Sequence, residues 1–202
     1  HINSTTLNFM QKFPNIQAQD PAVYDILQGE IKRQSEGLEM IPSENYASAA
    51  VLEANGSIFT NKYSEGYPGA RYYGGCEVID KVETLAQKRA LEAFNLDPAL
   101  WGVNIQGLSG APANMAIYFG IGGAGVKILG PELMHGGHLS HGFYLRDKKV
   151  SATSAYFNFA HYRRDPVTDL WNYDEIDLIA DRFKPKILIA GDRKSTRLNS
   201  SH

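Results

Sequence analysis

The side chains best suited to chemistry gather in one short stretch, residues 61–75, with the sequence NKYSEGYPGARYYGG. Glu65 is its only carboxylate, and four tyrosines near it offer ring faces and hydroxyls that suit a site for a flat polar ligand. A carboxyl group among such rings would be partly desolvated and could serve as a general acid. Glycine and proline exclude a regular helix or a central strand, so we expect an ordered loop. Composition alone favours a purely structural loop that packs on its own domain.

A second candidate site is the turn of Ser109, Gly110 and Ala111, which is predicted to join a strand to the N-terminus of a helix. The first N–H groups of a helix have no partner within it, and the helix dipole favours an anion there. Gly110 allows close approach of the backbone and Ser109 adds a hydroxyl donor, so the turn could hold a phosphate. Most turns of this kind only cap a helix, and this one is neither a Walker loop nor a GxGxxG motif.

Three histidines, His135, His138 and His141, recur at a spacing of three residues. On a helix they would lie on adjacent turns, and a zinc site would be the first interpretation. The glycines among them disfavour a helix, and Cys76 is the only cysteine of the chain, so we expect no metal site. An imidazole can instead lie flat against an aromatic ring.

Taken together, these stretches resemble the serine hydroxymethyltransferases, a family of fold-type I enzymes that use pyridoxal 5'-phosphate (PLP). The resemblance runs from about Asp20 to Gly191 and follows the order and spacing of the family. It implies an α/β fold: an N-terminal helical segment and an incomplete, mostly parallel sheet of the PLP-dependent transferase (aspartate aminotransferase-like) large domain. Besides residues 61–75, the matching motifs are IPSEN at 41–45, QKRALEAF at 87–94, SGAPAN at 109–114 and HGGHLSHGF at 135–143.

The resemblance assigns the cofactor contacts residue by residue. It places the PLP phosphate at Ser109, Gly110 and Ala111, and it stacks His138 on the PLP ring. It also lets Tyr63 reach the cofactor phosphate and the substrate of a neighbouring subunit. Ala111 stands where the family usually has a second serine, so we expect weaker phosphate binding but not its loss.

The resemblance also assigns the substrate contacts. It makes Glu65 the acid/base group near the substrate hydroxyl and the folate, and it leaves His135 and His141 with structural roles. A structural ion pair and a functional role are equally compatible with Arg71. The remaining assignments are Tyr72 and Tyr73 near the folate and the reacting carbon, Leu133, Gly137 and Leu139 against the pterin of tetrahydrofolate, and Ser43 at the edge of the substrate site.

The family interconverts serine and glycine with tetrahydrofolate as the one-carbon acceptor, giving 5,10-methylenetetrahydrofolate, while PLP acts as the electron sink. The resemblance puts the Schiff-base lysine, the carboxylate for the pyridine nitrogen and the arginine for the substrate beyond Gly191. This chain alone is therefore expected to be an inactive fragment of a homodimer or homotetramer. One alternative is another fold-type I PLP enzyme such as an aminotransferase, which Glu65 and the HGGH sequence disfavour. A second is a non-catalytic protein that binds a partner through its tyrosine-rich loop.

Helix caps and apolar spacing predict the elements that carry these residues. Asp20 and Pro21 begin a helix that Gly37 ends. Residues 43–45 can cap the short helix predicted at 47–59, and by the resemblance they lie at the edge of the substrate and cofactor site; both can hold at once. Strands at 103–105 and 126–129 flank a helix at 112–121, which indicates a right-handed βαβ unit and a parallel sheet. We further expect helices at 77–94 (with Val78, Val82, Leu85 and Arg89 on one stripe) and 173–183, and strands at 151–157 and 187–190.

Composition and charge limit the classes of partner, the compartment and the domain organisation that the sequence allows. The chain has 202 residues, 43% of them hydrophobic, and a net charge of −2, which argues against nucleic acid and anionic membranes as partners. No apolar run is long enough to span a bilayer. The single cysteine fits a reducing compartment, and the family leaves cytoplasm or mitochondrion open. We expect a poorly ordered arm at 1–19, a helical segment at 20–60, a partial PLP-binding large domain at 61–191 and a tail at 192–202, DRKSTRLNSSH, that departs from the family and reads as foreign sequence.

Overall fold

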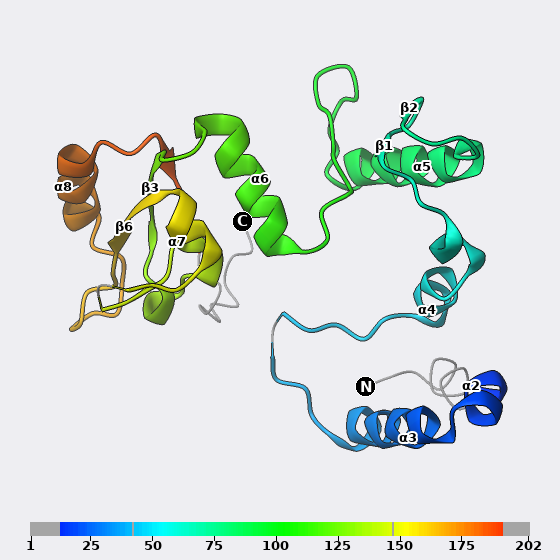
Figure 1. Cartoon of the computed structure of the whole chain (residues 1–202). Coiled ribbons are helices and arrows are strands. Elements are labelled where there is room, and N and C mark those ends of the chain that lie inside the picture. The colour runs from blue at the N-terminus through cyan, green and yellow to red at the C-terminus, as the bar shows by residue number, and fades with distance from the viewer. Residues whose placement is uncertain (1–12, 42, 147, 192–202) are drawn as a thin grey trace. The chain divides into compact units, whose positions relative to one another are not determined.

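The computed structural model describes residues 13–41, 43–146 and 148–191. The chain divides into two compact units, residues 1–103 and residues 104–202 (Figure 1). This division by contacts groups residues 61–103 with the N-terminal helices and not with the sheet. Each unit is described by itself.

The first unit begins with two helices, α2 (Pro14–Gln19) and α3 (Pro21–Glu36). The Asp20 side chain accepts a hydrogen bond from the Val23 N–H at 3.1 Å, and Gly37 ends α3, so both predicted caps are confirmed. The expectation of a poorly ordered arm up to residue 19 is wrong for α2, because Pro14 lies in the first turn and starts a helix there. The rest of that arm, residues 1–12, lies outside the described residues.

The helix predicted at residues 47–59 is shorter than expected. Helix α4 (Ala49–Asn55) ends at Gly56, and the 3₁₀ helix η1 (Ile58–Asn61) follows. Its cap is Ser48, whose hydroxyl accepts from the Val51 N–H at 3.3 Å. The expectation that residues 43–45 cap this helix is therefore wrong.

The tyrosine-rich loop contains a minimal hairpin and is followed by a long helix. Strands β1 (Gly66–Tyr67) and β2 (Ala70–Arg71) pair antiparallel, and α5 (Glu77–Ala93) begins shortly afterwards (Figure 1). Gly66 has a φ of +98°, and a Cβ atom there would lie 2.4 Å from the Ala70 carbonyl oxygen. The hairpin therefore needs glycine at this position.

Helix α5 turns a different face inward from the one predicted. Val78, Val82 and Leu85 are exposed, whereas Glu83 is buried. The reason is that Glu83 pairs with a buried arginine of the loop, which fixes the rotation of the helix more strongly than its apolar stripe does.

The second unit is built on a three-stranded parallel sheet with the order β6–β3–β7, which confirms the predicted α/β class (Figure 1). Its core consists of Tyr118, Val126, Ile128 and Phe157, with the Tyr118 and Phe157 rings in edge contact at 5.5 Å. The elements are α6 (Gly110–Gly122), β3 (Lys127–Pro131), η2 (Leu133–His135), η3 (Leu139–His141), β4 (Tyr144–Leu145), β5 (Lys148–Lys149), α7 (Ala152–Tyr156), β6 (Asn158–Tyr162), α8 (Tyr173–Phe183) and β7 (Ile187–Leu188).

Two predicted strands are not formed. Residues 103–105 have no strand assignment, so the predicted βαβ unit around α6 is wrong. The predicted strand at 151–157 is instead helix α7 over residues 152–156, because the Ser151 hydroxyl accepts from the Ser154 N–H and caps it. The parallel crossovers instead run from β3 through α7 to β6, and from β6 through α8 to β7. In the described part of the chain, no helix is both long and apolar enough to cross a membrane.

Candidate functional site

Arg71 anchors the tyrosine-rich loop to helix α5. Its side chain is only 5% exposed, and its Nε donates to Asp80 at 2.8 Å while Nη2 donates to Glu83. Nη1 donates to the carbonyl oxygens of Ser64 and Gly66, both at 2.7 Å. One guanidinium therefore joins both ends of the hairpin to two carboxylates on one helix. Of the two interpretations left open for Arg71, the structure supports the structural ion pair.

The charges in this network reinforce one another. The Gly69 N–H and then Arg71 hold the pKa of the Asp80 carboxyl below its usual range, because both donate hydrogen bonds to the charged form. Asp80, followed by Glu83, raises the pKa of Arg71. The loop is thus held by charges that persist across the neutral pH range.

The predicted catalytic side chains project outward from this anchored loop. The Tyr63 hydroxyl donates to the Glu65 carboxylate at 3.2 Å, and the Tyr63 and Tyr73 rings meet edge to face at 5.2 Å. Glu65 is exposed and Tyr72 is 79% exposed. The expectation that the neighbouring rings desolvate Glu65 is wrong, because Glu65 is exposed and the Tyr63, Tyr72 and Tyr73 side chains are exposed as well.

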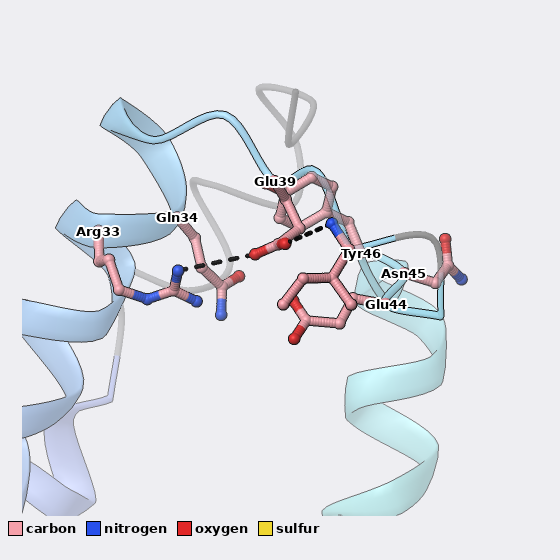
Figure 2. A pocket seen from close by; sticks show the side chains of 7 residues that line it. Arg33, Gln34, Glu39, Glu44, Asn45 and Tyr46 are labelled. Carbon is pink, nitrogen blue, oxygen red and sulfur yellow. Dashed lines mark hydrogen bonds and ion pairs between the residues drawn. The ribbon is translucent and has the colours of Figure 1, made fainter. Parts of the chain in front are cut away.

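Ser43 lies on an exposed turn beside a pocket of the first unit. The pocket has a volume of about 170 Å³ and lies between the end of α3 and the segment that follows Ser43 (Figure 2). Within it, Glu39 accepts from the Ile41 N–H at 2.9 Å and lies 3.8 Å from the Arg33 guanidinium. A hydrogen bond with Glu39 raises the pKa of Glu44, because the protonated Glu44 carboxyl is the donor to the Glu39 carboxylate. The lining residues are Arg33, Gln34, Glu39, Ile41, Glu44, Asn45 and Tyr46.

The predicted phosphate turn lies at the N-terminus of α6, as expected. Ser109 is the N-cap residue with an extended backbone, and its side chain makes no capping hydrogen bond. Pro112 has no N–H, so Gly110 and Ala111 supply the exposed donors of the first turn. A Cβ atom added to Gly110 would meet nothing within 4 Å. The turn therefore has both the donors and the room for an anion such as the PLP phosphate.

His138 lies in the same unit as α6 and is tied to it by hydrogen bonds. Its Nδ1 atom lies 2.7 Å from the Ser140 hydroxyl oxygen. The same oxygen accepts a hydrogen bond from the Asn114 amide of α6 at 2.8 Å. His138 lines a second pocket, of about 270 Å³, together with Leu133. Three of the predicted site features, the α6 turn, His138 and Leu133, thus belong to the same compact unit.

The other two residues assigned to the pterin differ from each other. Leu139 is exposed, as a contact residue must be. Gly137 is buried, and a Cβ atom there would lie 2.3 Å from the Pro131 carbonyl oxygen. Close backbone packing is sufficient to require glycine at position 137.

His135 and His141 are hydrogen-bonded within the fold, in keeping with their predicted structural roles. The Arg164 N–H donates to His135 at 3.2 Å, and the His138 N–H donates to His141 at 3.1 Å. Burial, followed by the nearby His138 and His161, lowers the pKa of His141 to about 4. Among the described residues, no group of three histidine, cysteine, aspartate or glutamate side chains could hold a metal ion.

Sequence reasoning missed the residues that hold the site together. Asp80 and Glu83 stand three apart on α5, and this acidic pair on a helix after a loop arginine was the available signal. Ser140 and Asn114 carry no comparable signal, because their contact spans 26 residues of sequence. The predicted site residues Ser43, Tyr63, Glu65, Tyr72 and Tyr73 lie in the first unit, and Ser109, Gly110, Ala111, Leu133, Gly137, His138 and Leu139 lie in the second.

The fold and the α6 turn define a class, an α/β protein with a parallel sheet and a helix N-terminus suited to an anion. A family model described as "Serine hydroxymethyltransferase" matches residues 16–200. The chain belongs to the serine hydroxymethyltransferase family.

Named relatives agree with this result. The chain is 56% identical over 177 residues to "Serine hydroxymethyltransferase" of Caenorhabditis elegans, which covers 88% of this chain and 35% of the relative. It is 55% identical over 172 residues to "Serine hydroxymethyltransferase, cytosolic" of Oryctolagus cuniculus (85% and 36%) and 50% identical over 184 residues to the "Putative serine hydroxymethyltransferase, mitochondrial" of Neurospora crassa (91% and 34%). The chain thus spans about a third of the length of these curated relatives, and their names do not favour an aminotransferase.

We predict that Arg71→Lys loosens the hairpin. Lysine keeps the charge but has no planar fork, so it cannot serve Asp80, Glu83 and two carbonyl oxygens at once. Amide hydrogen exchange in residues 64–71 of the 202-residue chain should speed up by roughly tenfold or more. Arg89→Lys, on an exposed part of α5, is the control and should leave these rates unchanged. Equal exchange rates in the two variants would contradict the anchoring role.

We predict that acid destabilises the second unit through His141. Its pKa is lowered from 6.5 to about 4, so between these pH values the folded state binds fewer protons than the unfolded chain. Stability therefore falls as the pH drops through this window, by about 1–3 kcal/mol. Urea denaturation from pH 7 to pH 4.5, followed by near-ultraviolet circular dichroism, measures the loss.

The matched variant for this prediction is His141→Asn. The asparagine amide oxygen can replace Nδ1 as the acceptor for the His138 N–H, but it does not titrate. Its stability profile should be flatter than that of the wild type over the same pH range. A profile as steep as that of the wild type would show that another group causes the acid loss.

Proposed function

We propose that the protein to which this chain belongs is a PLP-dependent enzyme that interconverts serine and glycine, with tetrahydrofolate as the one-carbon acceptor. The observation that carries this proposal is the match of residues 16–200 to the serine hydroxymethyltransferase family. An anchored loop that presents Glu65 and its tyrosines supports it. The cytosolic and mitochondrial relatives make either compartment compatible with the proposal.

The residues of the second unit fit the cofactor. The N–H groups of Gly110 and Ala111 and the Ser109 hydroxyl would hold the phosphate, and the His138 ring would lie against the pyridine ring. The free first turn of α6 and the open space at Gly110 support this assignment. When bound, PLP supplies an electron sink for the carbanion of the amino acid. The protein then has to orient the substrate, exclude water and move protons.

Proton transfer is the proposed role of Glu65. Its carboxylate accepts from the Tyr63 hydroxyl, which orients it, and it is exposed and so accessible to a substrate or a second subunit. Tyr72 and Tyr73 would form the wall for the folate and the reacting carbon. Ser43 would contact the amino acid, and Leu133, Gly137 and Leu139 would border the pterin. Because Tyr63 is assigned to a neighbouring subunit's cofactor, a homo-oligomer is part of the proposal.

We predict that Glu65→Gln in the full-length protein abolishes folate-dependent serine turnover while PLP stays bound. The amide keeps the shape of the side chain but cannot transfer a proton, so the loss should be roughly 10²- to 10⁴-fold. Turnover is measured by glycine formation and PLP content by absorbance. Glu53→Gln, an exposed carboxylate on α4, is the control. Retention of a tenth or more of wild-type turnover by Glu65→Gln would rule out this role.

We predict that His138→Ala weakens PLP binding more than His135→Ala or His141→Ala does. A stacked ring contributes about 0.5–1.5 kcal/mol beyond its buried area, which corresponds to a two- to tenfold change in Kd. Fluorescence titration of the three full-length variants with PLP provides the measurement. Equal losses in all three, restored by added zinc, would instead support a metal site.

A further inference from the structure

Ser140 lies at the centre of a buried hydrogen-bond network in the second unit. The residue is 3% exposed, and its hydroxyl oxygen contacts three side chains. The Asn114 amide donates to it at 2.8 Å, the Tyr118 phenol is hydrogen-bonded to it, and His138 Nδ1 lies 2.7 Å away. Asn114 and Tyr118 both belong to α6, so Ser140 connects this helix to the His138 loop.

The inventory of donors and acceptors limits the direction of these bonds. A serine hydroxyl has one hydrogen to donate and two lone pairs to accept with. The Asn114 amide occupies one lone pair as a donor. The single hydroxyl hydrogen can then be given to His138 Nδ1, provided that this nitrogen carries no proton.

The backbone of the same residue decides the His138 tautomer. The Ser140 N–H donates to His138 Nδ1 at 3.1 Å. A ring nitrogen that accepts hydrogen bonds carries no proton, so the proton of the neutral imidazole resides on Nε2. Both donors of Ser140 therefore act on the same nitrogen and require the same tautomer.

The Ser140 network also holds the His138 ring in place relative to helix α6. Asn114 lies one turn after Gly110 on α6, so the network sets the distance and the angle between the His138 ring and the first turn of that helix. The loop backbone is held as well, because the His138 N–H donates to His141. The ring and the helix terminus thus form one preorganised frame.

We infer that Ser140 is a positioning residue, which holds His138 in the Nε2–H tautomer and in a fixed orientation relative to the N-terminus of α6. The tautomer and the orientation follow from the hydrogen bonds alone. Their use, to align the ring with the cofactor, rests on the proposed function. Ser140 itself acts through His138 and not on the substrate.

The first test reads the tautomer directly. Long-range ¹⁵N–¹H correlation spectra of the histidine-labelled 202-residue chain distinguish protonated from unprotonated ring nitrogens. We expect the Nε2–H tautomer for His138 in the wild type and in Ser140→Thr, which keeps the hydroxyl, and a tautomer mixture in Ser140→Ala. Asn114→Asp should give the same loss, because a carboxylate would accept the hydroxyl hydrogen that now reaches Nδ1.

A matched control separates positioning from general stability. Ser154 is also a fully buried serine of this unit, and its hydroxyl donates to the Ser151 carbonyl oxygen at 2.7 Å. Ser154→Ala should lower the thermal stability but leave the His138 signals unchanged. An Nδ1–H tautomer in the wild type, or Ser140→Ala spectra identical to those of the wild type, would overturn the inference.

The second test measures PLP affinity in the full-length protein. We expect Kd to rise by roughly three- to tenfold in Ser140→Ala and to recover in Ser140→Thr. If the tautomer changes as expected but the Kd does not, the positioning of His138 is supported and its proposed contact with the cofactor is overturned. If PLP binding weakens while the tautomer stays fixed, the positioning role is overturned and the proposed function is not.

Discussion

The first unit depends on a single buried cation. Arg71 is nearly inaccessible to solvent, yet it makes hydrogen bonds to two carboxylates and two backbone carbonyl oxygens. A buried charge is tolerated only when it is paired and its donors are satisfied, so this set of acceptors is a requirement of the fold. The requirement dictates the rotation of α5, which turns Glu83 inward, and it dictates the glycine at position 66, where the hairpin backbone passes close to itself.

The same constraint explains why the reactive side chains of the loop are exposed. Arg71 directs its donors to Asp80, Glu83 and two loop carbonyl oxygens and not to Glu65. Glu65 stays exposed, where its hydrogen bond from Tyr63 orients it without burying it. The loop is therefore rigid at its base and accessible at its functional groups. This arrangement suits a carboxylate that must meet a ligand, or a second copy of the chain, brought to it from outside.

Sequence reasoning succeeded where the determinants are local and failed where they are tertiary. The cap at Asp20 and the donors at Ser109 and Gly110 follow from short-range backbone chemistry, and α3 and the α6 turn were predicted on that basis. Residues 151–157 were predicted as a strand, although the Ser151 cap begins a helix at residues 152–156. The inward face of α5 carries Glu83, which pairs with Arg71; the acidic pair of Asp80 and Glu83 was a signal for this contact, but the apolar spacing of the helix pointed to another face.

In both units, one polar side chain of a loop is hydrogen-bonded to two side chains of a neighbouring helix. In the first, a charged group on the loop donates to two carboxylates of α5. In the second, a neutral hydroxyl on the loop is hydrogen-bonded to two side chains of α6. In each case the helix supplies side chains that hold the centre, and the loop carries the groups assigned to ligand binding. A helix can do this because its side chains repeat on one face at spacings of three and four residues, as Asp80 with Glu83 and Asn114 with Tyr118 do. Glu65 follows Ser64, whose carbonyl oxygen accepts from Arg71, and His138 contacts Ser140 directly. The orientation of these two groups, which are proposed for chemistry, therefore follows from interactions in which they need take no catalytic part.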